Sequence, residues 1–375
     1  MKQLNNSVNL IVCQKSMIDT WRDHLNTYYD YLIYDLTNKK ELDKFIQSTE
    51  VRVGIINYDL IFRRKELLKI KDFCLVLDES SLINNEKAKR SKFIMKLQAK
   101  EIILLSGSLC GGKYERLWSQ LHLLGWNISK QLYWKQYIET ETTYNQGFPI
   151  KIVKGYKNVD RLKHKMCDYG CRFLKTDEVF DLPKQIFNTI KIDSTREYKI
   201  FRKDRIVSVG DTDFVGDTTL TKLLYERMLC GAYNKHKIEA LKDLLESTSD
   251  RVIIFYNFNN ELESISKLCT KPVSIVNGKE KDLSSYEKYD DSVTLIQYQA
   301  GAMGLNLQKA NKIIYFTPPL SSELFEQSKK RVHRIGQEKP CFYYLLTVKN
   351  SVEGRIYKTL AMRKDFTDYL FEKGD

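Results

Sequence analysis

The segment KIIYFTPPLSSELFEQSKKRVHRIGQ, residues 312–337, places an apolar, strand-like run before a stretch with helical spacing and a cluster of cations. Within it, Arg331 and Arg334 are spaced three residues apart, which predicts that both lie on one face of a helix. A guanidinium group is planar, carries five N–H donors and stays charged, so it suits phosphate oxygens. The alternative is a solvated basic helix end.

The same alternation of strand and helix recurs along the chain in two series. Helical stretches separate β-rich apolar runs, a pattern typical of parallel sheets that helices cover on both faces. We therefore predict an α/β fold with two such units. The runs are NLIVCQ, VRVGIINY, FCLVLDE and EIILLSG in the first series, and RVIIFYNF, KPVSIVNG, SVTLIQYQ, KIIYFTPP and CFYYLLTV in the second.

The sequence between the two series predicts the domain division. At 375 residues the chain is too long for one ordinary core. Residues from about 126 to 250 are first aromatic and basic, then polar with glycines, and Pro183 marks a break. We place a first lobe at residues 1–185, with a helical insertion from about residue 126. A second lobe at residues 186–375 begins with a helical entry segment.

The composition favours a polyanionic partner. Lys and Arg number 61 against 48 Asp and Glu, a formal net charge of +13, and such a surplus strengthens binding to nucleic acid through counterion release. No apolar run reaches membrane-spanning length, and the first residues lack the features of a signal peptide. From these two features we expect a cytoplasmic location and no membrane partner. The 8 cysteines mostly lie in apolar runs, which is typical of a reducing compartment.

Two strand ends in the first series carry polar residues that could serve chemistry. Asp78 and Glu79 follow a buried strand, where the first carboxylate could hold Mg²⁺ and the second could orient a water. The alternative is a turn with two solvated acids. Ser106, Gly107 and Ser108 follow the next run and could approach a nucleotide, although a tight turn explains them equally well.

The second series offers a corresponding group of residues. Gly301 and Gly304 allow close approach of the backbone, and Asn306 supplies an amide to a phosphate or to the backbone. The alternative is a helix start softened by glycine. Gln327 and Gln337 flank the two arginines of the opening segment.

Taken in order, these segments resemble the superfamily-two helicase-like ATPases of the Swi/Snf type, over nearly the whole chain. The small size looks most like phage and prophage members. LIVCQKSMIDTW resembles motif Ia, LDES motif II, LSGS motif III and RFLKTDEVFDLPKQ the link between lobes, while RVIIFYNF resembles motif IV, GAMGLNLQKANKIIYF motif V and EQSKKRVHRIGQ motif VI.

The resemblance implies two RecA-like lobes that bind ATP and Mg²⁺ between them and move along double-stranded DNA. We expect a monomer in the cytoplasm of a bacterium or a phage-infected host cell. Asp78 would bind magnesium, Glu79 would position the attacking water, and Arg331 and Arg334 would reach the nucleotide phosphates. Nucleotide contact or coupling is implied for Ser106, Gly107, Ser108, Gly301, Gly304, Asn306, Gln327 and Gln337, and DNA contact for Lys15, Ser16 and Asn257.

One part of the family pattern is missing from the expected place. The glycine-rich phosphate loop with its lysine and Ser/Thr precedes motif Ia in this family, and here only a few residues precede NLIVCQKS. We therefore expect a first lobe that is N-terminally incomplete. Three explanations are open: a chain start assigned too late, a natural truncation that abolished hydrolysis, or a segment supplied by another polypeptide.

A second match to the phosphate-loop pattern lies elsewhere. GSLCGGKY, residues 107–114, follows the acidic box, and Tyr114 stands where a Ser or Thr would contact magnesium. A turn leading into a helix is the favoured interpretation. The absent loop also motivates a rival function, a DNA-binding or scaffold protein without catalytic activity.

Overall fold

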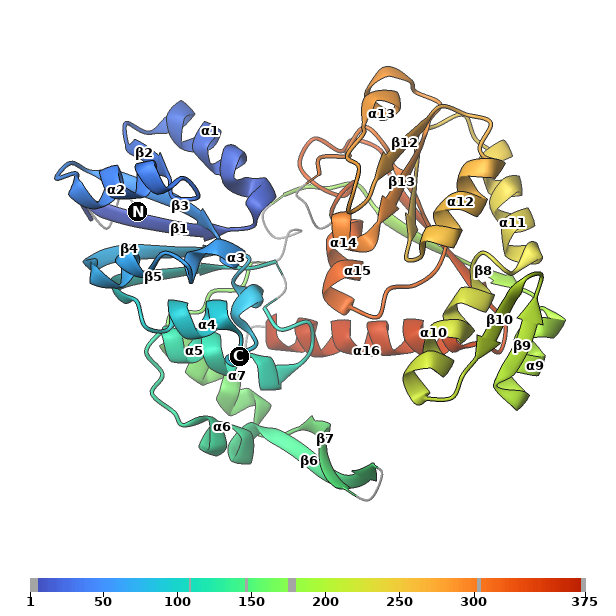
Figure 1. Ribbon diagram of the computed structural model, residues 1–375, viewed down its shortest axis with the longest axis horizontal. Helices are drawn as coiled ribbons and strands as arrows, with labels where there is room; N and C mark the ends of the chain where they lie inside the picture. Colours follow the sequence, from blue (N-terminus) through green and yellow to red (C-terminus); the bar gives the residue numbers. More distant parts are fainter. Residues whose placement is uncertain (1–5, 108, 146–147, 175–179, 302–304, 372–375) are drawn as a thin grey trace. The chain divides into compact units, whose positions relative to one another are not determined.

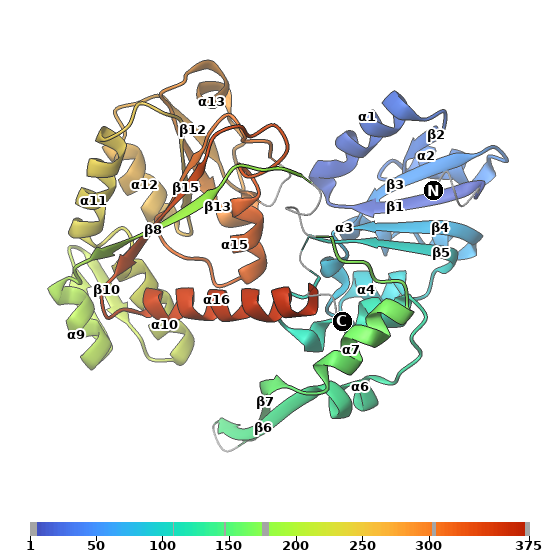
Figure 2. The ribbon, with the colours of Figure 1, turned by 180° about the vertical axis from the view of Figure 1, so that it is seen from behind.

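The structure is a computed structural model (Figure 1; from behind in Figure 2) that describes residues 6–107, 109–145, 148–174, 180–301 and 305–371. The chain forms two compact units. The first comprises Met1–Leu174 with Asp365–Asp375, and the second comprises Lys175–Lys364. The sequence analysis divided the chain between residues 185 and 186 and kept the last residues with the second lobe.

A five-stranded parallel sheet of order β2-β3-β1-β4-β5 is the centre of the first unit. Parallel neighbours need crossover connections, which helices and 3-10 turns supply here. The sequence patterns predicted all of these strands except β2, which is short and at most half-buried. The elements are β1 (Val8–Cys13), η2 (Lys15–Met17), α1 (Ile18–Tyr28), β2 (Leu32–Asp35), α2 (Lys39–Gln47), β3 (Arg52–Asn57), α3 (Tyr58–Ile61), η3 (Lys65–Lys69), β4 (Lys71–Asp78), η4 (Ser80–Ile83), α4 (Lys89–Ile94) and β5 (Gln98–Leu105).

Both faces of this sheet are buried. Successive residues of a strand point to opposite faces, so β1 and β4 each contribute to two separate apolar clusters. Burial on both sides explains why these strands read as continuous apolar runs. One cluster contains Leu10, Val12, Leu75 and Leu77, and the other contains Ile11, Cys13, Cys74 and Val76.

The predicted insertion contains helices and also an antiparallel hairpin that the sequence analysis did not predict. The hairpin, β6–β7, has alternating β-branched residues, a pattern that favours strands. Tyr133 and Tyr137 of the preceding helix are buried in an aromatic core. The elements of this part are η5 (Tyr114–Arg116), α5 (Trp118–Leu123), α6 (Lys130–Tyr137), β6 (Ile138–Asn145), β7 (Phe148–Tyr156) and α7 (Val159–Asp168).

The second unit contains a six-stranded parallel sheet of order β12-β13-β11-β14-β15-β8. Of its strands, the sequence analysis missed β8, an edge strand with several exposed residues. The strands are β8 (Gln185–Ile192), β11 (Val252–Tyr256), β12 (Val273–Val276), β13 (Val293–Gln297), β14 (Lys312–Tyr315) and β15 (Cys341–Val348), with a hairpin of β9 (Ile206–Val209) and β10 (Thr212–Val215).

Helices flank this second sheet, as Figures 1 and 2 show. A buried ion pair joins two of them: Lys237 Nζ of α11 lies 2.6 Å from Glu353 Oε1 of α16. The predicted α/β fold class, with two units that each contain a parallel sheet flanked by helices, is confirmed. The helices are α9 (Arg196–Asp204), α10 (Thr219–Cys230), α11 (Lys235–Glu246), α12 (Asn259–Leu268), α13 (Ser284–Lys288), α14 (Tyr298–Gly301), α15 (Ser322–Lys329) and α16 (Val352–Phe371).

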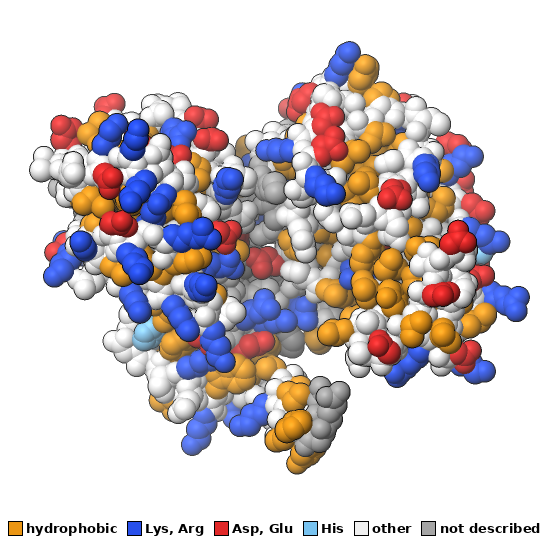
Figure 3. Space-filling model, in the orientation of Figure 1, with side chains coloured by type: hydrophobic (Ala, Val, Ile, Leu, Met, Phe, Trp, Pro, Cys, Tyr) orange, Lys and Arg blue, Asp and Glu red, His pale blue; other side chains and the backbone are white. Residues whose placement is uncertain are grey.

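The surface charge and the length and apolar character of the helices are two further features of the structure. On the face in Figure 3, Lys and Arg side chains are numerous over the first unit. Among the described residues, no helix has the length and apolar character needed to cross a bilayer.

Candidate functional site

The acidic pair lies at the carboxyl end of β4, an interior strand of the first sheet. Asp78 is the last residue of that strand and is half-buried. Its Oδ2 accepts a hydrogen bond from Trp21 Nε1 at 2.9 Å, and its backbone carbonyl accepts one from the Tyr58 hydroxyl at 3.0 Å. Burial raises the pKa of the neighbouring Cys13 thiol to about 12, and the negative charge of Asp78 adds to this rise.

Glu79 has a strained backbone. Its φ of 59° and ψ of 56° are left-handed, a conformation that costs a residue with a side chain on the order of 1 kcal/mol or more. Its Oε1 accepts hydrogen bonds from Ser81 Oγ at 3.2 Å and from Ser106 Oγ at 3.1 Å. Such strain is typical of functional sites.

The contact between Glu79 and Ser106 follows from strand pairing. β4 and β5 are parallel neighbours in which Asp78 pairs with Leu105, so the residues after both strands meet at one sheet edge. The structure thus brings together three of the predicted site residues. Gly107 follows directly in the same loop, and Ser108 lies outside the described residues.

The turn of residues 109–113 is closed around Cys110. Gly111 and Gly112 have φ of 57° and 70°. The Lys113 N–H donates to the Cys110 carbonyl at 3.1 Å. Burial raises the pKa of the Cys110 thiol to about 12, while hydrogen bonds from the Lys113 and Gly112 amides oppose that rise. This geometry is that of a tight turn around a buried cysteine.

The arginines of the second unit do not lie on a helix, so that prediction was wrong. Helix α15 ends at Lys329, and both arginines fall in the turns that follow. The buried Gln337 side chain stabilises these turns by donating to the carbonyls of Ala310 at 2.8 Å and Gln308 at 3.1 Å. The Leu307 N–H also donates to the Arg331 carbonyl at 3.1 Å.

Two predicted residues meet in this loop region. The Arg334 guanidinium donates to the side-chain carbonyl of Asn306, whose own side chain is exposed.

Among the described residues of the second unit, nucleotide contact or coupling was also predicted for Gly301, Gln327 and Gln337. Gly301 ends α14 and Gln327 is half-buried in α15. Gly304 lies outside the described residues. The side-chain amide of Gln337 is used inside the lobe, which gives its predicted nucleotide contact no support.

The predicted DNA contacts have unequal surroundings. Lys15 and Ser16 are exposed in η2, directly after β1. The amide of Asn257 is instead directed into its own unit, because Nδ2 donates to Thr317 Oγ1 at 2.8 Å and to the Pro318 carbonyl at 3.2 Å. Asn257 therefore joins the loops after β11 and β14.

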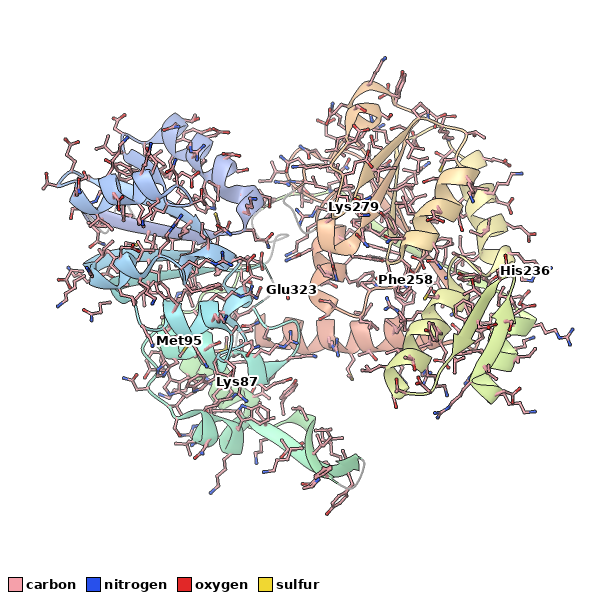
Figure 4. The ribbon with its side chains drawn as sticks, in the orientation of Figure 1. Lys87, Met95, His236, Phe258, Lys279 and Glu323 are labelled. Atoms are coloured by element: carbon pink, nitrogen blue, oxygen red, sulfur yellow. The ribbon has the colours of Figure 1, made fainter. Side chains whose placement is uncertain are left out.

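A buried carboxylate beside Asn257 was missed by the sequence analysis. Burial raises the pKa of Glu261 to about 7, although it accepts hydrogen bonds from the Asn257 and Phe258 amides and the Thr317 hydroxyl. The Arg227 guanidinium carbon lies 5.0 Å from the centre of the Phe258 ring, which Figure 4 labels. Burial lowers the pKa of Arg227. A glutamate in the first turn of a predicted helix was the signal for this cap.

These features define a class of two-lobed α/β proteins with an acidic pair at a strand end of one lobe and arginines after a helix of the other. A model of the SNF2-related domain matches residues 2–246, and a model of the helicase conserved C-terminal domain matches residues 236–336. The chain belongs to the SNF2-related family.

Characterised relatives are distant and much longer. The chain is 24% identical over 417 residues to the mouse (Mus musculus) SWI/SNF-related matrix-associated actin-dependent regulator of chromatin subfamily A member 1, covering 98% of this chain and 39% of that protein. It is 24% identical over 406 residues to the ISWI chromatin-remodeling complex ATPase ISW1 of Saccharomyces cerevisiae, covering 94% and 35%. The chain thus spans less than half the length of these relatives.

Among solved structures, the chain matches the Sulfolobus solfataricus SWI2/SNF2 ATPase core in complex with double-stranded DNA. The match has 19% identity and a TM-score of 0.42, and it covers 98% of this chain and 83% of that one.

Proposed function

We propose that the protein couples ATP hydrolysis to movement along double-stranded DNA, and that DNA stimulates the hydrolysis. The observation that carries the proposal is the geometry after β4 and β5, where a half-buried aspartate and a strained glutamate meet Ser106. Membership of the SNF2-related family supports ATP as the hydrolysed substrate.

Asp78 has the properties of a magnesium ligand. Mg²⁺ prefers oxygen ligands and is usually held by one or two carboxylates together with phosphates and water. Among the described residues, no hydrogen-bond donor reaches Asp78 Oδ1. The described residues also contain no group of three or more His, Cys, Asp or Glu that could hold a metal, so Asp78 would share the ion with phosphates and water. A bound Mg²⁺ would supply charge neutralisation at the phosphates.

In this proposal Glu79 orients the attacking water. Hydrogen bonds from two serines fix one oxygen of its carboxylate and so set the direction of the group. Since Ser106 follows β5, movement of that loop would change the orientation of Glu79. Ser106 therefore takes the coupling role in this proposal.

The second lobe would contribute positive charge. Arg331 and Arg334 would bind the phosphates and stabilise the charge that develops there during transfer, an effect worth on the order of a thousandfold in rate. In the structure Asn306 accepts a hydrogen bond from the Arg334 guanidinium. We propose that this contact is exchanged for the nucleotide.

DNA contact in this proposal is made through the phosphates. Lys15 and Ser16 are exposed and can meet backbone oxygens without reading bases. The net charge of +13 supports a salt-sensitive, sequence-independent interaction.

A DNA-binding scaffold without hydrolysis is the second candidate. The observation in its favour is the turn of residues 109–113, where the Gly112 and Lys113 amides bind Cys110. An amide that binds Cys110 is not available to a phosphate in this conformation.

Steady-state ATP turnover of the protein, measured with and without duplex DNA, separates the two candidates. The proposal expects magnesium-dependent turnover that rises with DNA and falls on the order of a hundredfold or more in Glu79→Gln, which removes the charge and keeps the shape. DNA binding without turnover above the Glu79→Gln level would establish the scaffold.

A further inference from the structure

We infer that Trp21 is a positioning residue that orients Asp78 for a divalent cation, an inference that rests on the proposed function. Its indole Nε1 donates to Asp78 Oδ2 at 2.9 Å across 57 positions of sequence. The indole N–H is a donor only, so it can bind the carboxylate without competing for the metal.

Packing fixes the direction of the indole. Ile18 and Leu25 are the buried residues of α1, and Trp21 lies between them at helical spacing. The Trp21 ring packs against the apolar cluster on that face of the first sheet. It also meets the His24 ring edge-on, with the ring centres 6.4 Å apart. The donor therefore stays aimed at the end of β4.

The consequence for Asp78 is a defined division of its two oxygens. Trp21 occupies Oδ2, the Tyr58 hydroxyl fixes the backbone carbonyl, and among the described residues no donor reaches Oδ1. Because Trp21 is neutral, its hydrogen bond does not offset the charge of the Asp78 carboxylate. A Lys or Arg in its place would offset that charge.

Trp118 provides a matched control in the same unit. It is also half-buried, its Nε1 also donates a hydrogen bond of 2.9 Å, and its ring also contacts a histidine. The acceptor is the Ile128 carbonyl instead of Asp78. Trp118→Phe and Trp21→Phe thus each remove one indole hydrogen bond of the same length. Only the bond that Trp21→Phe removes involves the proposed metal ligand Asp78.

The first test measures the affinity of a fluorescent ATP analogue with magnesium and again in EDTA, so that the ratio reports the contribution of the metal. Asp78→Ala sets the ratio that remains without the ligand. Groups that orient a metal ligand typically account for tenfold or more in metal affinity, so Trp21→Phe should lower the ratio about tenfold. Trp118→Phe should leave it unchanged, and the affinity in EDTA should be the same in all.

The outcomes separate the two claims. If magnesium does not raise the affinity of the wild-type protein, the proposed metal site fails and this inference fails with it. If Asp78→Ala removes the magnesium effect while Trp21→Phe retains it, the metal site stands and the positioning role is overturned.

A second test needs no Trp21 variant to fold. The chain has 4 tryptophans, whose indole N–H signals can be assigned in proton–nitrogen correlation spectra. Asp78→Asn replaces the charged acceptor with a neutral amide, so the Trp21 signal should move upfield while that of Trp118 stays. An unmoved Trp21 signal would overturn the inference.

Discussion

Glu261 is a carboxylic acid with no exposed surface in the second unit. Its Oε2 accepts from the Asn257 amide at 2.8 Å and from Thr317 Oγ1 at 3.0 Å. These bonds favour the charged form, yet burial dominates and raises the pKa from 4.5 to about 7. The side chain thus titrates near neutral pH while it joins α12 to the loop after β14.

This shift predicts a pH-dependent stability. The folded state holds the Glu261 proton up to about pH 7, whereas the unfolded state loses it near pH 4.5. The contribution of this proton to the free energy of unfolding is therefore fully present below pH 4.5 and is lost as the pH rises to about 7. Glu261→Gln keeps an acceptor and removes the charge. At pH 8 it should raise the free energy of unfolding by on the order of 3 kcal/mol.

Urea unfolding between pH 5 and pH 8 measures this directly. Glu263→Gln, an exposed position of the same helix, is the control and should follow the wild type. Parallel pH curves for Glu261→Gln and the wild type would show that Glu261 does not titrate in this range.

Sequence reasoning located the acidic pair at residue scale because parallel strands end at a common edge. It predicted Asp78, Glu79 and Ser106 on that basis, and the structure brings them together. It could not predict the destination of polar side chains whose partners are distant in sequence. The bond from Trp21 to Asp78 and the inward amide of Asn257 are of this kind.

At the scale of elements, the buried parallel strands were predicted and the edge strands were not. Central strands such as β1 and β11 are apolar on both faces, whereas β2 and β8 carry exposed residues that interrupt the pattern. The helical spacing around Arg331 misled for a different reason. Tertiary hydrogen bonds from Gln337 stabilise turns that local spacing does not reveal.

Packing between elements makes a specific demand at Gly54 of β3. A Cβ at this position would lie 2.6 Å from Leu36 Cδ1 and 3.1 Å from Phe45 Cε2, and both neighbours are fully buried. Overpacking of this kind typically costs about 1–3 kcal/mol. We predict that Gly54→Ala lowers the stability of the first unit by about that amount in chemical unfolding.

Gly278→Ala is the control for this substitution, because a Cβ there meets nothing within 4 Å. It should change the free energy of unfolding by less than about 0.5 kcal/mol. Equal stability of the two variants would contradict this prediction. It would mean that Leu36 and Phe45 can move aside without lowering the free energy of unfolding.

At the scale of the whole molecule, the two units contribute opposite charges to the proposed chemistry. The acids Asp78 and Glu79 belong to the first unit, and Arg331 and Arg334 belong to the second. Each unit has its own sheet and core. The central claim is therefore that both units act on one triphosphate.

The most direct test compares ATP turnover and nucleotide affinity in Arg334→Ala, with Lys330→Ala as a control that removes an exposed charge nearby. Under saturating duplex DNA and magnesium, the account predicts that Arg334→Ala lowers kcat on the order of a thousandfold while affinity changes less than about tenfold. Lys330→Ala should retain turnover near the wild-type rate. A fall in turnover no greater than the fall in affinity, or full turnover without Arg334, would contradict the claim that the second unit acts on the phosphates held by the first.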